Sequence, residues 1–219
     1  MSTRDDELIA IKALFNPKSI AVIGASQDVF VNPGGRLVST LQRYGFKEIY
    51  PVNPRRSEVL GIKCYPSVEA IPSSVDLACI AVPTAAVPQV LADCARKGIK
   101  AAIIPTAGFG ESGVQGKEME RAIKRIADQE GIQVCGPNCL GIISTVTNLY
   151  ASFTYALEVT PITGEIGLVS QSGALAAGIL TRMTDRGVGI SYWISSGNEV
   201  DLEMADYVKY LVQDPFTKT

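Results

Sequence analysis

Short, nearly continuous apolar runs alternate with longer amphipathic segments along most of the chain. The runs at 19–23 and 77–82 read Ser-Ile-Ala-Val-Ile and Leu-Ala-Cys-Ile-Ala-Val, the pattern of strands buried on both faces. Further runs of this kind predict strands at 48–53, 100–104 and 132–135. Segments with helical periodicity lie between the strands, at 35–44, 87–97 and 117–130. This alternation predicts an α/β fold in which helices cover both faces of a parallel sheet.

The apolar periodicity lapses between 144 and 164, and a second α/β unit follows. Its predicted strands and helices lie at 165–170, 172–186, 189–195 and 201–213. A parallel-sheet domain usually has about five strands, so we expect this unit to be incomplete. The expected organisation is an N-terminal segment (1–13), a first domain (14–143), a linker (144–164) and a truncated second domain (165–219). An unfinished sheet has an exposed edge, so we also expect an oligomer.

The composition is that of an ordinary globular protein, with 47% apolar and 19% charged residues among 219. The formal charge of −2 provides no positive field for nucleic acid or an acidic membrane. No apolar run approaches the ~20 residues of a membrane span, and the N-terminus lacks the layout of a secretory signal. The five cysteines are too scattered for a disulfide framework. We therefore expect a cytoplasmic protein with no nucleic-acid or membrane partner.

The sequence contains no histidine, which removes Ser-His-Asp and Cys-His catalysis and most zinc sites. Cys135 and Cys139 bracket a Gly-Pro-Asn turn, but no further ligands complete a tetrahedral set, so we expect no metal site. Cys135 ends a strand and is predicted to be a small buried residue. Cys139 follows in a loop, where it either packs in the same way or lies beside a bound thiol or acyl group.

Parallel sheets bind ligands at the carboxyl ends of their strands, so the residues after each strand are site candidates. They are small, polar or Pro/Gly: Gly24-Ala25-Ser26, Asn53-Pro54-Arg55, Pro83-Thr84, Thr106-Ala107-Gly108 and Asn138-Cys139. Such residues leave backbone groups accessible, so the pattern indicates a cleft for a phosphorylated ligand.

Two of these loops indicate the ligand more closely, although each has a simpler explanation. The first turn lacks the dinucleotide pattern G-x-G-x-x-G, because Ser26 and Val29 replace glycines. It indicates a phosphate near a helix N-terminus, or only a flexible connector. NAD enzymes place an acidic residue where this chain has Arg55 and Arg56. Guanidinium groups there suit a ribose phosphate, as in NADP or the 3′-phosphate of coenzyme A, or form a solvated basic turn.

Two other segments depart from the catalytic motifs that they superficially suggest. Residues 113–118 do not form a phosphate loop, because Glu111 occupies its first glycine position and Lys117 is followed by glutamate. Ser170-Gln171-Ser172-Gly173 is no nucleophile elbow, since position 170 is not glycine and no histidine can act as base. This segment offers backbone N–H groups and two hydroxyls to an anion, or is a plain serine N-cap.

One ordered set of segments resembles a known family. In chain order they read SIAVIGAS, YPVNP, DLACIAVP, AAIIPTAGF, CGPNCLG, GEIGLVSQSGALA and SSGNEVD. This set resembles the NDP-forming acyl-CoA synthetases, the ADP-forming acetate–CoA ligase group related to the α subunit of succinyl-CoA synthetase. The resemblance extends from about residue 14 to residue 219, and the order of the segments makes it specific.

The resemblance implies a Rossmann-like CoA-binding domain followed by a flavodoxin-like, succinyl-CoA synthetase-like domain. It also implies the joining of a carboxylic acid to CoA with cleavage of ATP to ADP, through an acyl phosphate and a phosphohistidine. By position, the CoA phosphates would contact Gly24, Ala25 and Ser26, and the nucleotide end would contact Asn53, Pro54 and Arg55. Adenine would pack on Val82 and Pro83, pantetheine would pass Thr106, Ala107 and Gly108, and the thiol would lie near Asn138 and Cys139. The phosphate on the histidine would meet Ser170, Gln171, Ser172 and Gly173.

The family's phosphohistidine is absent from this chain, so the resemblance assigns it no catalytic residue. The glutamate that supports the histidine, and the ATP-grasp module that binds ATP/ADP and Mg²⁺, are also absent; relatives carry that module as a separate subunit or a C-terminal fusion. We therefore expect this chain to bind CoA without completing the reaction alone. The alternatives are a CoA-binding regulatory or scaffold module, as in acyltransferase fusions, and an NADP-dependent oxidoreductase supported only by Arg55 and Arg56.

Overall fold

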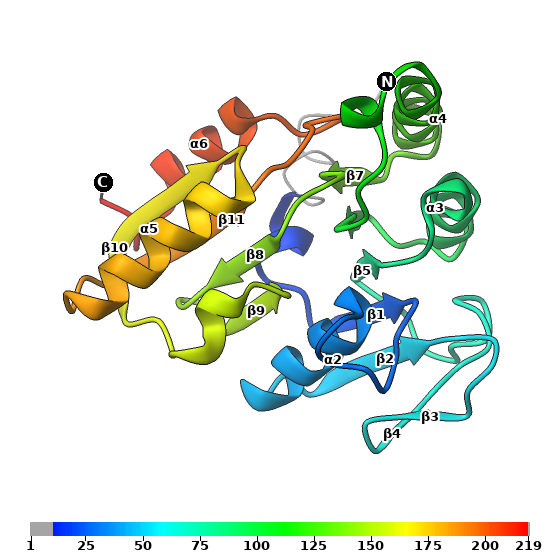
Figure 1. Cartoon of the computed structure of the whole chain (residues 1–219), viewed down its shortest axis with the longest axis horizontal. Helices are drawn as coiled ribbons and strands as arrows, with labels where there is room; N and C mark the ends of the chain where they lie inside the picture. Colours follow the sequence, from blue (N-terminus) through cyan, green and yellow to red (C-terminus); the bar gives the residue numbers. More distant parts are fainter. Residues whose placement is uncertain (1–10, 219) are drawn as a thin grey trace.

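The computed structural model describes residues 11–218, which form two main β-sheets with helices on their faces and one small two-stranded sheet (Figure 1). All strands of the first sheet are parallel, in the order β2–β1–β5–β6–β7. They are β1 (Ser19–Ile23), β2 (Glu48–Val52), β5 (Leu77–Ile80), β6 (Ala101–Ile103) and β7 (Gln133–Cys135). The connecting helices are α2 (Pro33–Arg43), α3 (Val87–Arg96) and α4 (Val114–Glu130). The α/β architecture predicted from the apolar runs is confirmed.

The buried strands of the first sheet supply two cores, because successive side chains point to opposite faces. Ile20 and Val22 of β1 pack on one side with Leu37 of α2 and with residues of the second sheet. Ala21 and Ile23 pack on the other side beneath α3 and α4. The first sheet is therefore covered by two helices on one face, and by α2 and the second sheet on the other.

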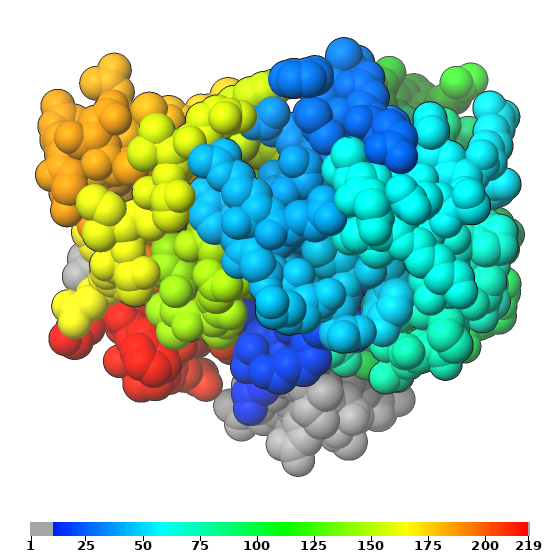
Figure 2. Space-filling view, turned by 90° about the horizontal axis from the view of Figure 1, so that it is seen from below, coloured from blue at the N-terminus to red at the C-terminus, as the bar shows by residue number. Residues whose placement is uncertain are grey.

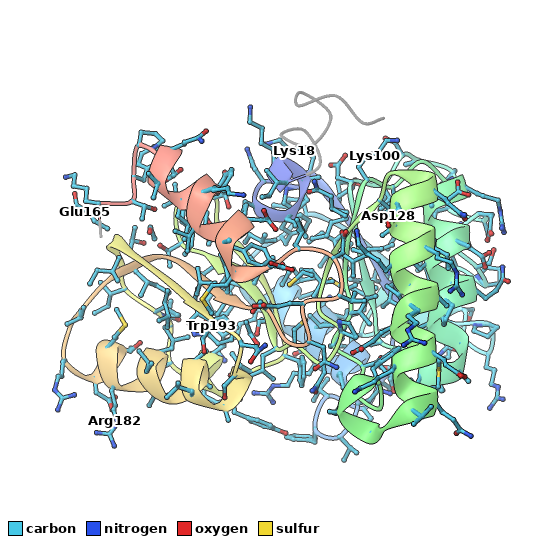
Figure 3. The ribbon with its side chains drawn as sticks, turned by 90° about the horizontal axis from the view of Figure 1, so that it is seen from above. Lys18, Lys100, Asp128, Glu165, Arg182 and Trp193 are labelled. Carbon is cyan, nitrogen blue, oxygen red and sulfur yellow. The ribbon has the colours of Figure 1, made fainter. Side chains whose placement is uncertain are left out.

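The second sheet has the strand order β10–β11–β8–β9 and is mixed. Its strands are β8 (Gly141–Ser144), β9 (Leu149–Ser152), β10 (Thr163–Ser170) and β11 (Ile190–Ser195). β10 and β11 are parallel, whereas β8 runs antiparallel to both β11 and β9. Helix α5 (Gly173–Asp185) packs on the face that carries Trp193, and Figure 3 shows this side chain beside the helix. Helix α6 (Met204–Gln213) packs on the opposite face with Tyr192 and Ile194.

The segment 144–164, which was predicted to be a linker, contains regular secondary structure. It contains β9 and the short 3-10 helix η3 (Tyr155–Glu158), and it begins at the end of β8. β8 pairs with β11, which lies about fifty residues further along the chain, so local periodicity does not reveal the pairing. The domain limits at 143 and 165 stay a prediction, and the N-terminal segment 1–13 falls largely outside the described residues.

Two small elements between β2 and β5 were also not anticipated. β3 (Glu58–Val59) and β4 (Ile62–Lys63) form a two-residue antiparallel hairpin, too short to leave an alternating pattern. The other predicted elements are present, and their ends differ from the predicted ones by at most three residues. Helix α6 begins at Met204, where Glu203 and Asp206 form a reciprocal capping box.

Aromatic and ionic contacts join the two sheets into one body. Tyr44, which follows α2, stacks on Tyr150 of β9 with ring centroids 3.7 Å apart. Phe15 stacks on Tyr210 of α6 at 4.4 Å. The Arg36 guanidinium lies 2.5 Å from a Glu158 carboxylate oxygen. Figure 2 shows the surface of α2 against the segment around β9 and η3. Within residues 11–218, no helix is both long and apolar enough to cross a membrane.

Candidate functional site

A cavity of about 780 Å³ lies where the carboxyl ends of strands from both sheets meet. The first sheet contributes the loops after β5, β6 and β7, together with Pro33 at the start of α2. The second sheet contributes Phe153, the N-terminus of α5 and the Gly197-Asn198 pair after β11. Parallel strands direct their following loops to one edge, so segments distant in sequence converge here.

The structure brings together part of the predicted site. The predicted residues that line the cavity are Val82, Thr106, Ala107, Asn138, Cys139, Gln171, Ser172 and Gly173. The predicted residues that do not line it are Gly24, Ala25, Ser26, Asn53, Pro54, Arg55, Pro83, Gly108 and Ser170. The cavity therefore unites the residues assigned to the pantetheine and thiol end with those assigned to the phosphoryl end.

The first turn requires glycine at position 24 and holds α2 close to β1. Gly24 has φ +86°, and a Cβ there would lie 2.2 Å from the carbonyl oxygen of Ala81. The Gly24 carbonyl oxygen in turn excludes a side chain at Gly34, where a Cβ would lie 2.3 Å away. Asn32 caps α2 by accepting from the Gly35 N–H at 3.0 Å. This turn is thus a rigid corner, which does not support the alternative of a flexible connector.

The ends of β1 and β2 are linked by Asn53, whose side-chain amide donates to the Ala25 carbonyl at 2.8 Å. Its Oδ1 accepts from the Arg55 N–H at 2.9 Å, which shapes the basic turn. The Arg55 side chain is exposed, beyond the cavity lining. This corner therefore presents a fixed turn with a guanidinium group free to reach solvent or a ligand.

The N-terminus of α5 opens directly into the cavity. Ser172 is its N-cap, and the Ser172 hydroxyl oxygen accepts from the Leu175 N–H at 3.3 Å. This hydroxyl therefore acts as an ordinary serine N-cap. The first N–H groups of a helix have no intrahelical acceptor, and Gly173 and Ala174 border the cavity. The positive end of the helix dipole adds to their effect. This terminus can therefore accept an anion without using the serine hydroxyl.

The cysteines next to the cavity are packing residues. Cys139 is 2% exposed, and its sulfur lies 3.4 Å from the Ile104 carbonyl oxygen. Its hydrogen bond with Cys135, followed by burial, raises the pKa of the Cys139 thiol well above its ordinary value. Cys135 is fully buried, which confirms the prediction made for it. Because the Cys139 thiol is buried and its pKa is raised, it stays protonated at neutral pH and is unsuited to act as a nucleophile.

Among residues 11–218, all five cysteines are free and buried. Burial raises the pKa of Cys79 and of Cys94 to about 12, so these thiols are also unreactive at neutral pH. The described part of the chain holds no group of three or more His, Cys, Asp or Glu side chains placed to bind a metal ion.

A polar network that the sequence analysis missed connects the two sheets at the rim of the cavity. The Asn198 side-chain amide donates to Glu111 at 2.6 Å and to Glu120 at 2.7 Å. Its Oδ1 accepts from the Asn138 amide at 3.2 Å. Glu111 also accepts from the N–H of Gly108 at 2.5 Å. The signal available in the sequence was the position of Asn198 in the loop that follows the predicted strand 189–195.

The network affects the titration of Glu111. Partial burial alone would raise the pKa of this carboxyl, but hydrogen bonds from Asn198 and from backbone N–H groups outweigh it, so the pKa is lowered. Gly197 permits the close approach of Asn198, because a Cβ at this residue would lie 2.2 Å from the Pro137 carbonyl oxygen. The rim is therefore a fixed contact between the loops after β6, β7 and β11.

Both parts of the chain match known families. Residues 18–145 match the CoA binding domain, and residues 163–219 match the succinyl-CoA ligase like flavodoxin domain. The chain is 45% identical over 197 residues to the acetate–CoA ligase (ADP-forming) II subunit alpha of Pyrococcus furiosus, covering 90% of this chain and 42% of that protein. It is 42% identical over 215 residues to the acetate–CoA ligase (ADP-forming) of Methanocaldococcus jannaschii, covering 98% and 29% respectively.

A solved structure shows the same arrangement of elements. It is the dinucleotide forming acetyl-coenzyme A synthetase 1 of Ca. Korarchaeum cryptofilum in complex with phosphate and ADP. The TM-score is 0.89 at 38% identity, and the match covers 95% of this chain and 44% of that one. The chain thus spans less than half the length of each of these three relatives.

Proposed function

Because the chain belongs to the CoA binding domain family and continues into a succinyl-CoA ligase like flavodoxin domain, we propose that it is the CoA-binding part of an ADP-forming acyl-CoA ligase. Such a ligase joins a small carboxylic acid to CoA as ATP is cleaved to ADP, through an acyl phosphate and a phosphohistidine. The observation that supports this proposal is the cavity lined both by loops of the first sheet and by the N-terminus of α5. A thiol ligand and a phosphoryl group can meet there.

In this proposal each sheet binds a different part of the reacting system. The turn at Gly24-Ala25-Ser26 and the basic corner at Arg55 hold the phosphates and the nucleotide end of CoA. Val82 and Pro83 pack on adenine, Thr106, Ala107 and Gly108 line the path of pantetheine, and the thiol lies beside Asn138 and the backbone of Cys139. Since the Cys139 thiol is buried and hydrogen-bonded to the Ile104 carbonyl, this residue contributes shape and no chemistry.

The N-terminus of α5, at Ser170-Gln171-Ser172-Gly173, binds the transferred phosphoryl group through its N–H groups and dipole. This chain contains no histidine, so the phosphohistidine of the proposed reaction lies outside it. In the proposal, ATP/ADP and Mg²⁺ also bind to a segment or subunit outside this chain. An ATP-grasp subunit or fused domain is the partner that the proposal requires, and assembly with it or with a second copy is part of the proposal. Free cysteines suit the reducing cytoplasm, where we place the protein.

CoA is expected to stabilise the 219-residue chain against heat. At a concentration 100 times Kd a ligand adds about 2.7 kcal/mol. For a chain of this size that corresponds to a rise in Tm of roughly 5–10 °C. Differential scanning fluorimetry with CoA, dephospho-CoA, NADP and ATP measures this. Dephospho-CoA should act more weakly, and the other two should have little effect. A rise with NADP and none with CoA would replace the proposal by the oxidoreductase alternative.

The Arg55→Ala substitution is expected to weaken CoA binding roughly five- to tenfold, because the guanidinium would no longer pair with the 3′-phosphate. Dephospho-CoA lacks this phosphate, so its affinity should change less than twofold. Isothermal titration calorimetry with both ligands separates the effects. The Arg121→Ala substitution removes the same charge from the exposed surface of α4 and serves as the control. Equal losses for both ligands would show that Arg55 does not contact the 3′-phosphate.

A further inference from the structure

A second recess of about 410 Å³ adjoins the main cavity on the side of α5. The two share Leu140 and Phe153 as wall residues. Beyond this shared wall, the recess is bounded by the 3-10 helix η3 and by Ala177, Gly178 and Thr181 of α5. The two cavities therefore meet at these two side chains.

The lining of the recess is mainly apolar, and its hydroxyl groups form hydrogen bonds with the protein backbone. The Thr154 hydroxyl oxygen accepts from the Ala156 N–H at 3.3 Å, and the Thr181 hydroxyl donates to the Ala177 carbonyl at 3.0 Å. The Tyr155 hydroxyl donates to the Phe30 carbonyl at 2.8 Å. No lysine, arginine, aspartate or glutamate lines the recess. The surface offered to an occupant is mostly hydrocarbon, and no charged side chain of the lining would pair with a charged group there.

The walls of the recess are held in place. The Leu140 backbone donates to the Ser195 hydroxyl at 3.0 Å and accepts from the Ser152 hydroxyl at 2.7 Å. The Tyr155 ring lies beneath the Arg36 guanidinium, at 3.7 Å from its central carbon. On the helix side the room comes from a missing side chain, because a Cβ at Gly178 would meet nothing within 4 Å. The recess is thus a formed space that a side chain at position 178 would partly fill.

We propose that this recess binds the acyl group of the substrate, and that it selects carboxylic acids with an uncharged apolar body of about four to eight carbon atoms. The inference rests on the proposed function, which places the CoA thiol beside Asn138 and the Cys139 backbone. Leu140 is the next residue, so an acyl group on that thiol extends past Leu140 and Phe153 into the recess. Acetate would leave the recess empty, and a dicarboxylic acid would place a charge against hydrocarbon.

The test is a series of Kd values for CoA, acetyl-CoA, hexanoyl-CoA and succinyl-CoA, measured by calorimetry on the 219-residue chain. Each fully buried methylene strengthens binding about fourfold. Hexanoyl-CoA is therefore expected to bind at least tenfold tighter than acetyl-CoA, and succinyl-CoA no tighter than acetyl-CoA. Equal affinities for CoA and its three thioesters would overturn the inference, and would favour a protein side chain as the group that fills the recess. Absence of binding for CoA and for all its thioesters would overturn the proposed function and the inference with it.

The Gly178→Leu variant provides a second test, because the leucine side chain would occupy part of the recess. The substitution should not impair folding, since replacing a glycine within a helix favours the helix. The hexanoyl-CoA to acetyl-CoA affinity ratio is expected to fall from at least tenfold to below threefold. Arg182→Leu introduces the same side chain one position beyond the recess lining, where Figure 3 shows the arginine projecting from α5, and should preserve the ratio. An unchanged ratio in Gly178→Leu, or an equal loss in Arg182→Leu, would overturn the assignment of the recess.

Discussion

Trp193→Ala is expected to lower the free energy of unfolding by about 3–5 kcal/mol, the usual loss for removing a buried aromatic side chain. Trp193 is fully buried in the core between α5 and the second sheet. Its indole N–H donates to the Ala176 carbonyl at 2.9 Å, which fixes α5 against β11. Since globular proteins are stable by about 5–15 kcal/mol, this change removes a large fraction of the total.

Urea unfolding followed by far-UV circular dichroism measures the effect, because Trp193 is the only tryptophan and its fluorescence is lost in the variant. Trp193→Phe keeps most of the ring and loses the hydrogen bond, so it should cost roughly 1–2 kcal/mol. If Trp193→Ala lowers the free energy of unfolding by less than about 1 kcal/mol, contacts other than those of Trp193 hold α5 against the sheet.

Asn198→Asp is expected to destabilise the protein by about 1–3 kcal/mol near pH 7.5 and to weaken CoA binding. The amide that donates to Glu111 and Glu120 would become a third carboxylate, so both of these hydrogen bonds would be lost and like charges would face one another. Because the network holds the loops after β6 and β11 together at the rim of the cavity, its rupture should also disturb the ligand site.

This loss should depend on pH in a defined direction. The pKa of Glu111 is lowered in the folded protein, so its stabilising contribution is present above the unfolded value of about 4.3 and fades as the pH falls through the lower folded value. In the aspartate variant, protonation at pH 4–4.5 relieves the repulsion, so its deficit in Tm should shrink there. Asn198→Ala removes the donors without adding charge and should show a smaller deficit near pH 7.5. A deficit in Asn198→Asp that does not change with pH would exclude like-charge repulsion.

The first sheet could be predicted because the information for it is local. Each strand, such as Ser19–Ile23, is a short apolar run, and the following helix encodes the crossover that makes the sheet parallel. The second sheet was predicted only for β10 and β11. β8 and β9 pair with a strand that comes later in the chain, and their four-residue lengths leave no pattern that distinguishes strands from an apolar loop.

The candidate site could be predicted as a set of loops, and less well as a set of contacts. The position after each strand sufficed to find Thr106, Asn138 and Ser172, because the fold brings these positions to one edge. The side-chain direction of Cys139 depends on Ile104, and the partners of Asn198 come from α4 and the loop before it. Such contacts between distant segments leave no trace in the spacing of residues.

The pairing of β8 and β9 with β11 has a consequence for how this architecture can be divided. The family matches end at residue 145 and resume at residue 163, which assigns β8 to the first part and places β9 between the two. A cut at either limit would expose Ile142 and Ile143, which are fully buried in the intact chain. If gene fusion or recombination exchanged the two halves among ligases, the exchanged piece would have to begin before Gly141, so that the hairpin travels with the sheet it completes.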